Sequence, residues 1–235
     1  MSLAENIAHI RSRMDAAALA AGRDPASVTL VAATKVQTSD TIRAGIAAGI
    51  TVCGENRVQE LTAHLADNAY EGAQLHFIGH LQTNKVKYIV GKVGLIHSVS
   101  SLRLLDAIDA QAAKVGVVQD ILLEVNVGEE GSKSGFDPAE IPAAAAYAAA
   151  LPHVRLRGLM AIPPVAVEEG ANLPYFVEMR QLLVDINGVL GDNVSDINLL
   201  SMGMSDDFED AIAAGATHVR VGTAIFGARP PRPVE

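Results

Sequence analysis

The feature that most constrains the fold is a regular alternation of short apolar segments with segments of helical periodicity. The first apolar segment, Val28 to Ala33, is continuous and rich in β-branched residues, as in strands that are buried on both faces of a parallel sheet. Seven further segments resemble it, and a helical pattern follows each one. The expected strands are 28–33, 50–53, 74–78, 95–97, 117–127, 154–160, 196–200 and 217–221.

Helical patterns fill the intervals between these strands, and one more helix precedes them all. Its start is marked by Ser2 and Glu5, which form a capping-box pattern, and its end by Gly22. The other expected helices are 39–48, 56–66, 82–89, 101–114, 139–150, 172–189, 206–214 and one that starts near Thr223. Eight βα units in 235 residues predict an α/β fold, a (β/α)8 TIM barrel with an extra N-terminal helix. The main alternative is an open doubly wound sheet.

Composition and charge narrow the possible partners. No Pro/Gly/Ser-rich linker divides the chain, so we expect a single domain over residues 1–235. The net charge of −9 disfavours a phosphate backbone as partner, and 4% aromatic residues without Trp offer no stacking platform for single strands. We therefore expect no nucleic-acid partner.

Cysteine and histidine usage exclude several kinds of site. Cys53 is the only cysteine, so neither an internal disulfide nor a cysteine zinc cluster can form, and no H-E-x-x-H spacing occurs. The N-terminus lacks the pattern of a signal peptide, and no apolar run approaches the roughly 20 residues that span a bilayer. We expect a soluble cytoplasmic protein without a metal site, whose residues 228–233 form a surface tail.

One lysine lies where barrel enzymes carry their chemistry. Lys35 directly follows the first strand, at the carboxyl end of a barrel strand. Apolar walls there would lower the pKa of the amine and favour a Schiff base with an aldehyde. The alternative is an ordinary strand-end lysine that reaches solvent or pairs with an acid. The other five lysines lie in polar helix faces or loops: Lys85, Lys87, Lys92, Lys114 and Lys133.

The last two βα loops predict an anion site. Barrels often bind phosphate at the loops after strands seven and eight, and here these loops carry Ser205, Gly222 and Thr223. Acidic residues crowd the helix after the first loop: Asp206, Asp207, Glu209 and Asp210. They would repel an anion there, so the phosphate is placed mainly on Gly222 and Thr223. The alternative is a pair of ordinary glycine-containing turns.

A lysine after strand one and a phosphate cradle after strands seven and eight fit one ligand, because strands one and eight are neighbours in a closed barrel. Pyridoxal 5′-phosphate (PLP) carries an aldehyde on one side and a phosphate on the other. Arg220, two residues before Gly222, would then lie under the ring and face its nitrogen.

Two further residues have two interpretations each. His80 is a general base or orients its loop. Lys133 contacts a second PLP or a partner, or it is a solvated loop residue. His76 and His97 are interpreted as core histidines.

Long motifs give the chain a resemblance to the YggS/PROSC-type PLP homeostasis proteins. They are GENRVQE at 54–60, HFIGHLQTNK at 76–85, GLMAIP at 158–163, LSMGMS at 200–205 and VRVGTAIFG at 219–227. The resemblance implies a single-domain barrel similar to the N-terminal domain of alanine racemase. It implies that Lys35 forms the internal aldimine, that Ser205, Gly222 and Thr223 hold the phosphate, that Arg220 faces the pyridine nitrogen, and that Asn56 lies near the ring. Two departures are visible, at Arg57, where Tyr is frequent, and at Val36-Gln37.

The resemblance also implies PLP homeostasis without substrate turnover, and no catalytic residue is assigned. An arginine at the ring nitrogen leaves the pyridine unprotonated and makes it a poor electron sink. Racemases of this fold add a base with help from a second domain, for which this chain has no residues left. Expected partners are PLP and apo PLP-dependent enzymes, with a monomer or weak dimer as the oligomeric state. The alternatives are an amino-acid racemase and a phosphate-binding barrel enzyme without PLP.

Overall fold

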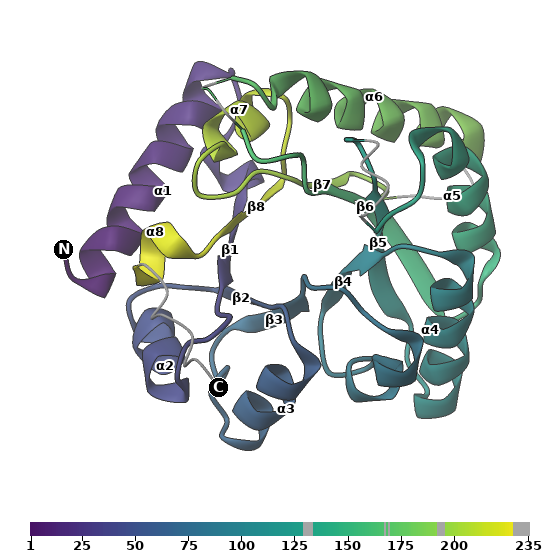
Figure 1. Cartoon of the computed structure of the whole chain (residues 1–235), viewed down its shortest axis with the longest axis horizontal. Helices are drawn as coiled ribbons and strands as arrows, with labels where there is room; N and C mark the ends of the chain where they lie inside the picture. The colour runs from purple at the N-terminus through teal and green to yellow at the C-terminus, as the bar shows by residue number, and fades with distance from the viewer. Residues whose placement is uncertain (129–133, 167, 169, 192–195, 228–235) are drawn as a thin grey trace.

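The fold is a closed barrel of eight parallel strands that follow one another in chain order (Figure 1). The computed structural model describes residues 1–128, 134–166, 168, 170–191 and 196–227. The barrel closes where β1 pairs with β8, with Val31 opposite Arg220. The predicted TIM barrel is therefore confirmed, and the open doubly wound alternative is wrong. The strands are β1 (Thr29–Ala33), β2 (Val52–Glu55), β3 (Gln74–Phe77), β4 (Leu95–Val99), β5 (Gln119–Val125), β6 (Val154–Ala161), β7 (Leu199–Ser201) and β8 (His218–Val221).

Helices surround the barrel in an outer ring (Figure 1). They are α1 (Leu3–Ala20), α2 (Ser39–Ala47), α3 (Val58–Ala66), α4 (Leu102–Val115), α5 (Ile141–Ala150), α6 (Leu173–Leu190), α7 (Phe208–Ala213) and α8 (Thr223–Phe226), with 3-10 turns η1 (Pro25–Ser27), η2 (Thr83–Tyr88) and η3 (Pro138–Glu140). The segment expected as a helix at 82–89 forms only the 3-10 turn η2. It is short, it has no side-chain N-cap, and β-branched Thr83 and Val86 are weak helix formers.

The extra N-terminal helix completes the outer ring beside the short α8. Ser2 and Glu5 form the predicted capping box, and the helix ends at Ala20 with Gly22 at φ 67° just beyond it. Asn6 Nδ2 donates to the carbonyl of Ile225 in α8 at 2.9 Å. Because α8 has only four residues, α1 covers the part of the barrel that a longer last helix would cover.

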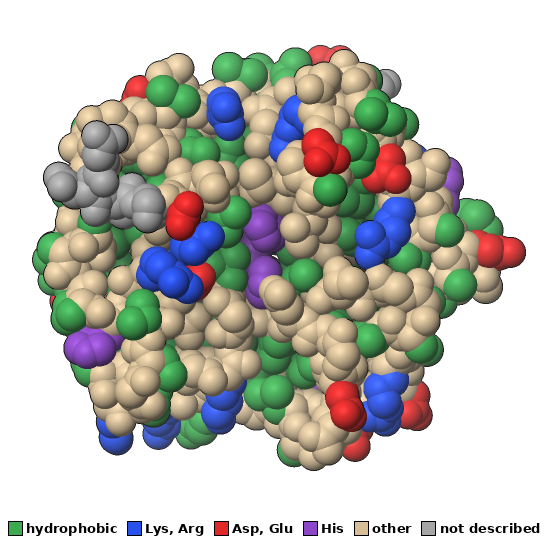
Figure 2. All heavy atoms as spheres, turned by 180° about the vertical axis from the view of Figure 1, so that it is seen from behind, with side chains coloured by type: hydrophobic (Ala, Val, Ile, Leu, Met, Phe, Trp, Pro, Cys, Tyr) green, Lys and Arg blue, Asp and Glu red, His purple; other side chains and the backbone are tan. Residues whose placement is uncertain are grey.

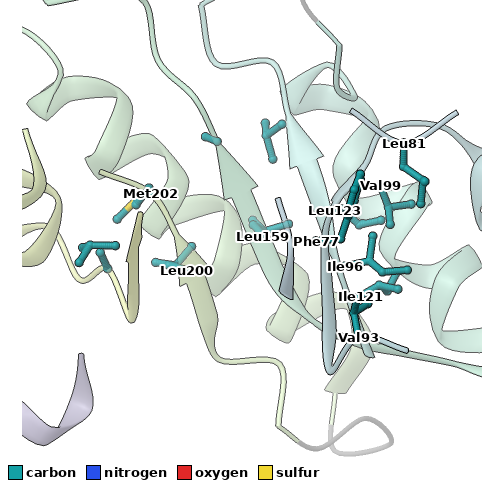
Figure 3. Packing of buried hydrophobic residues seen from close by; sticks show 14 of the residues in the cluster. Phe77, Leu81, Val93, Ile96, Val99, Ile121, Leu123, Leu159, Leu200 and Met202 are labelled. Atoms are coloured by element: carbon teal, nitrogen blue, oxygen red, sulfur yellow. The ribbon is translucent and has the colours of Figure 1, made fainter. Parts of the chain in front are cut away.

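Apolar side chains pack on the outer side of the strands, against the helices. In the close view of Figure 3, Phe77, Ile96, Val99, Ile121 and Leu123 lie together, and all five are buried. Because side chains alternate along a strand, the residues between them point into the barrel.

The barrel interior is divided between apolar and polar side chains. Two small buried clusters supply the apolar part: Val31, Ala33, Val52 and Ile78 in one, and Leu95, Leu122 and Met160 in the other. The polar part comes from buried residues of β3, β4, β5, β7 and β8: His76, His97, Glu124, Ser201, His218 and Arg220. Among the described residues, no helix is long and apolar enough to cross a membrane.

Candidate cofactor-binding site

Four of the six predicted site residues follow strands that are neighbours in the barrel. Lys35 lies two residues after β1, and Asn56 directly follows β2, which pairs with β1 through Ala33 and Gly54. Gly222 and Thr223 directly follow β8, on the other side of β1. Parallel strands end at the same edge, so the barrel brings these loops together at its carboxyl end (Figure 1).

Lys35 occupies a tight turn. The Gln37 N–H donates to the Thr34 carbonyl at 3.1 Å, which closes a four-residue turn with Lys35 and Val36 at its centre. Val36 has a φ of 59°, a left-handed conformation that costs a β-branched residue about 1–2 kcal/mol. The Val36 N–H donates to Glu60 Oε2 at 2.8 Å. The turn is therefore a strained one that its surroundings hold in place.

A buried carboxylate fixes the start of this turn. Glu55 is fully buried, and its Oε1 accepts from Thr34 Oγ1 at 2.7 Å and from the Tyr70 hydroxyl at 2.8 Å, with His64 Nδ1 at 3.2 Å. Burial and then the charge of Glu55 raise the pKa of Tyr70, so its hydroxyl stays a donor. Sequence reasoning missed this role. The one signal in the sequence was a glutamate at the end of a buried strand pattern. A buried acid at such a position requires hydrogen-bonding partners.

Asn56 has a buried polar atom that is available to a ligand. Its Oδ1 has no hydrogen-bond partner among the described residues, although the atom is buried. Gly79 packs directly on its backbone, since a Cβ at Gly79 would lie 2.0 Å from the Asn56 carbonyl oxygen. A buried unpaired oxygen costs free energy unless something donates to it. The residues present at this point thus fit a polar ligand.

Gly222 packs tightly against the end of β1, at the predicted anion site. A Cβ there would lie 3.2 Å from Ala33 Cβ and 3.3 Å from its carbonyl oxygen. Gly222 is the N-cap of α8, whose first residue, Thr223, is exposed. The end of β8 therefore approaches the end of β1 closely, next to the Lys35 turn.

Two of the acidic residues near Ser205, Asp207 and Glu209, are engaged with partners of their own. Asp207 is buried and accepts from the Met204 N–H and from Asn172 Nδ2, both at 2.7 Å. Glu209 pairs with Arg13 on α1 at 2.6 Å. Asp207 therefore holds the loop that carries Ser205, and this use of the acid was not predicted.

Arg220 lies inside the barrel rather than in a loop. One guanidinium nitrogen donates to Ser201 Oγ at 2.6 Å and another to the Ala161 carbonyl at 2.8 Å. Burial lowers its pKa to about 10, while the charges of Asp207 and Glu124 oppose the shift. Arg220 is still a cation at neutral pH. Burial likewise raises the pKa of Glu124, a neighbouring acid that sequence reasoning did not select.

A column of histidines continues from Arg220 through the barrel. His97 Nδ1 lies 2.8 Å from Ser201 Oγ, and His97 Nε2 lies 3.0 Å from His76 Nδ1. Arginine only donates, so Ser201 accepts from Arg220 and can donate to His97, which in turn donates to His76. Histidine side chains are visible at the centre of the face in Figure 2. His76 and His97 are buried and hydrogen-bonded, which confirms them as core histidines.

Because of these histidines, we expect the protein to lose much of its stability in acid. Burial lowers the pKa of His76 to about 3 and of His218 to about 4, and that of His97 well below its usual value, with smaller contributions from the neighbouring charges. The unfolded chain then binds more protons than the folded one below about pH 6.5. The stabilisation that these neutral histidines provide is fully present above that pH. As the pH falls below it, the free energy of unfolding decreases by about 1.4 kcal/mol per pH unit for each histidine.

Urea unfolding at several pH values tests this expectation. The variant His97→Asn keeps an acceptor for Ser201 but removes one titrating group, so its free energy of unfolding should change less steeply with pH than that of the wild type. Parallel pH curves for the two proteins would contradict the assignment.

The expectations for His80, for Lys133 and for the C-terminal tail stay untested. His80 is exposed after β3, and its two interpretations stay open. Lys133 and the tail at 228–233 lie outside the described residues. Among the residues that are described, no group of three or more His, Cys, Asp or Glu could hold a metal ion.

Comparison with known proteins gives consistent matches over the whole barrel. Residues 2–230 match the family model of the alanine racemase N-terminal domain. The pyridoxal phosphate homeostasis protein of Pseudomonas aeruginosa is 44% identical over 228 residues, covering 97% of this chain and 96% of its own. The protein of the same name from Aquifex aeolicus is 42% identical and covers 97% of this chain and 99% of its own.

Solved structures agree with these matches. PipY of Synechococcus elongatus, solved with PLP bound, superposes with a TM-score of 0.83 at 33% identity, covering 96% of this chain and all of that one.

Proposed function

Because the chain belongs to the family of pyridoxal phosphate homeostasis proteins, built on the alanine racemase N-terminal domain, we propose that it binds PLP at the carboxyl end of its barrel. It serves intracellular PLP homeostasis and holds the cofactor without turning over a substrate. The observation that carries the proposal is the position of Lys35, in a turn held between the loops of Asn56 and Gly222. PipY, a relative with bound PLP, supports it.

Six residues would hold the cofactor. Lys35 would bind the aldehyde carbon covalently, Ser205, Gly222 and Thr223 the phosphate, and Arg220 the ring nitrogen, with Asn56 beside the ring. The unpaired Asn56 Oδ1 and the close approach of Gly222 to β1 support this placement. We further propose that residues 1–235 act as one PLP-binding domain.

The electrostatics of the barrel are consistent with binding PLP without turnover, although racemases of this cofactor class tolerate the same arginine. PLP supplies an aldehyde and a ring that accepts electrons best when its nitrogen is protonated. Arg220 is a donor held as a cation by the nearby charges of Glu124 and Asp207, so it has no lone pair to accept a proton from the ring. A ring nitrogen facing Arg220 would stay unprotonated, so the ring would withdraw electrons weakly. Arg220 would therefore bind the ring without making it a strong electron acceptor.

A titration of the purified protein with PLP tests the proposal. We expect one equivalent to bind with a new visible absorbance band, and borohydride reduction to fix the cofactor to one peptide. Incubation of the PLP-loaded protein with an apo PLP-dependent enzyme should restore that enzyme's activity, as expected of a protein that donates PLP in the cytoplasm. Racemisation of amino acids well above background would overturn the carrier function, and a protein that stays colourless would overturn PLP binding itself.

A further inference from the structure

We propose that Glu60 is a positioning residue for Lys35, which it holds in place through the backbone of the turn. The inference rests on the proposed function, because Lys35 is the residue that captures PLP there. Glu60 lies on α3, on the outer side of the barrel, and reaches the turn through one hydrogen bond to the Val36 N–H. It does not follow a strand and belongs to none of the predicted site residues.

The first step of the argument is the conformation of Val36. Its φ of 59° is one that glycine adopts without cost and that a β-branched residue avoids. Lys35 immediately precedes it, so any relaxation of Val36 reorients the lysine. The carboxylate of Glu60 accepts the Val36 N–H at 2.8 Å, and a charged acceptor makes such a bond stronger than a neutral one. Glu60 thus stabilises the conformation that Val36 would otherwise leave.

The second step is that the other end of the turn is already fixed. Thr34 donates through its hydroxyl to the buried Glu55 and through its N–H to the Gly54 carbonyl at 3.0 Å. The Thr34 side of the turn is therefore held independently of Glu60. On the Val36 side, the Glu60 carboxylate adds to the hydrogen bond from Gln37 to Thr34 that closes the turn, and its substitution leaves the buried contacts of Glu55 intact.

The third step concerns the two departures from the family pattern. The Val36 N–H donates to Glu60 Oε2, and Arg57 Nη1 lies 3.4 Å from Glu60 Oε1. Both unusual residues thus meet at one carboxylate. Arg57 is the more exposed partner of this ion pair.

Glu60→Ala is the test, with two independent readouts. Hydrogen exchange at the Val36 amide should become about tenfold faster, as expected for loss of one hydrogen bond worth about 1.4 kcal/mol. The rate at which PLP is captured covalently should fall several-fold. Glu60→Gln keeps an acceptor oxygen, so it should recover most of the amide protection and most of the capture rate. Gln59 is an exposed neighbour on the same helix, and Gln59→Ala should behave like the wild type.

A double variant separates positioning from a general weakening of the fold. Val36→Gly removes the backbone strain, so Glu60→Ala should slow capture less in that background than in the wild type. Equal Val36 exchange in wild type and Glu60→Ala, or unchanged capture despite faster exchange, would overturn the inference. A wild-type protein that never captures PLP would instead refute the proposed function, while the exchange measurement would still report on the turn.

Discussion

The variant Lys35→Ala should lose the visible band that PLP induces in the wild type, and borohydride should no longer fix the cofactor to the protein. The reason is chemical: Lys35 is the amine placed at the carboxyl end of β1, between the loops of Asn56 and Gly222. We expect PLP affinity to fall about 100-fold, or about 2.7 kcal/mol, because only the phosphate and ring contacts are left. Absorbance titration and mass spectrometry of the reduced protein measure both effects.

Two further variants make this result specific. Lys35→Arg keeps a long cationic side chain but has no amine that condenses with an aldehyde, so it should also lose the band. Lys114→Ala removes an exposed lysine of α4 and should leave the band unchanged. A full band in Lys35→Ala would mean that PLP binds another lysine. Thermal unfolding should be nearly the same in all three proteins, because Lys35 is only partly buried.

The position of Lys35 could be predicted because it depends on local pattern. An apolar run rich in β-branched residues is typical of a strand in a parallel sheet, and the residue after it must lie at the carboxyl edge. Counting eight such runs was then enough to place Gly222 and Thr223 beside Lys35. Each of these inferences needs only the order of elements along the chain.

The contacts that hold the site could not be predicted in the same way. Gly222 packs on Ala33, and Arg220 forms a hydrogen bond with Ser201, which forms another with His97. Such contacts depend on strand register and on which side chains face inward, and a shift of one residue would exchange the two faces. The same limit applies to Glu60, whose bond to Val36 depends on a backbone conformation that valine rarely adopts.

The motif at 76–85 predicts the second large effect, which concerns stability as well as the site. Gly79 follows β3, and a Cβ there would lie 2.0 Å from the carbonyl oxygen of Asn56 and 2.6 Å from its Cα. All these atoms are backbone, so no side-chain rotation relieves the clash. We expect Gly79→Ala to destabilise the protein by about 3 kcal/mol, which lowers Tm by about 6–12 °C in a chain of this size.

The same clash should displace Asn56 from the ring site, so PLP affinity should fall even at temperatures where the variant is folded. Gly188→Ala is the matched control. Gly188 lies in α6 with nothing within 4 Å of its Cβ position, and alanine there should stabilise the helix by up to about 1 kcal/mol. Calorimetry and PLP titration of the two variants should therefore show opposite changes in Tm, and lost affinity in Gly79→Ala alone. A Gly79→Ala protein as stable as the wild type would show that the loop of Asn56 can move away from position 79 without cost. The backbone of Asn56 would then not be fixed by its contact with Gly79.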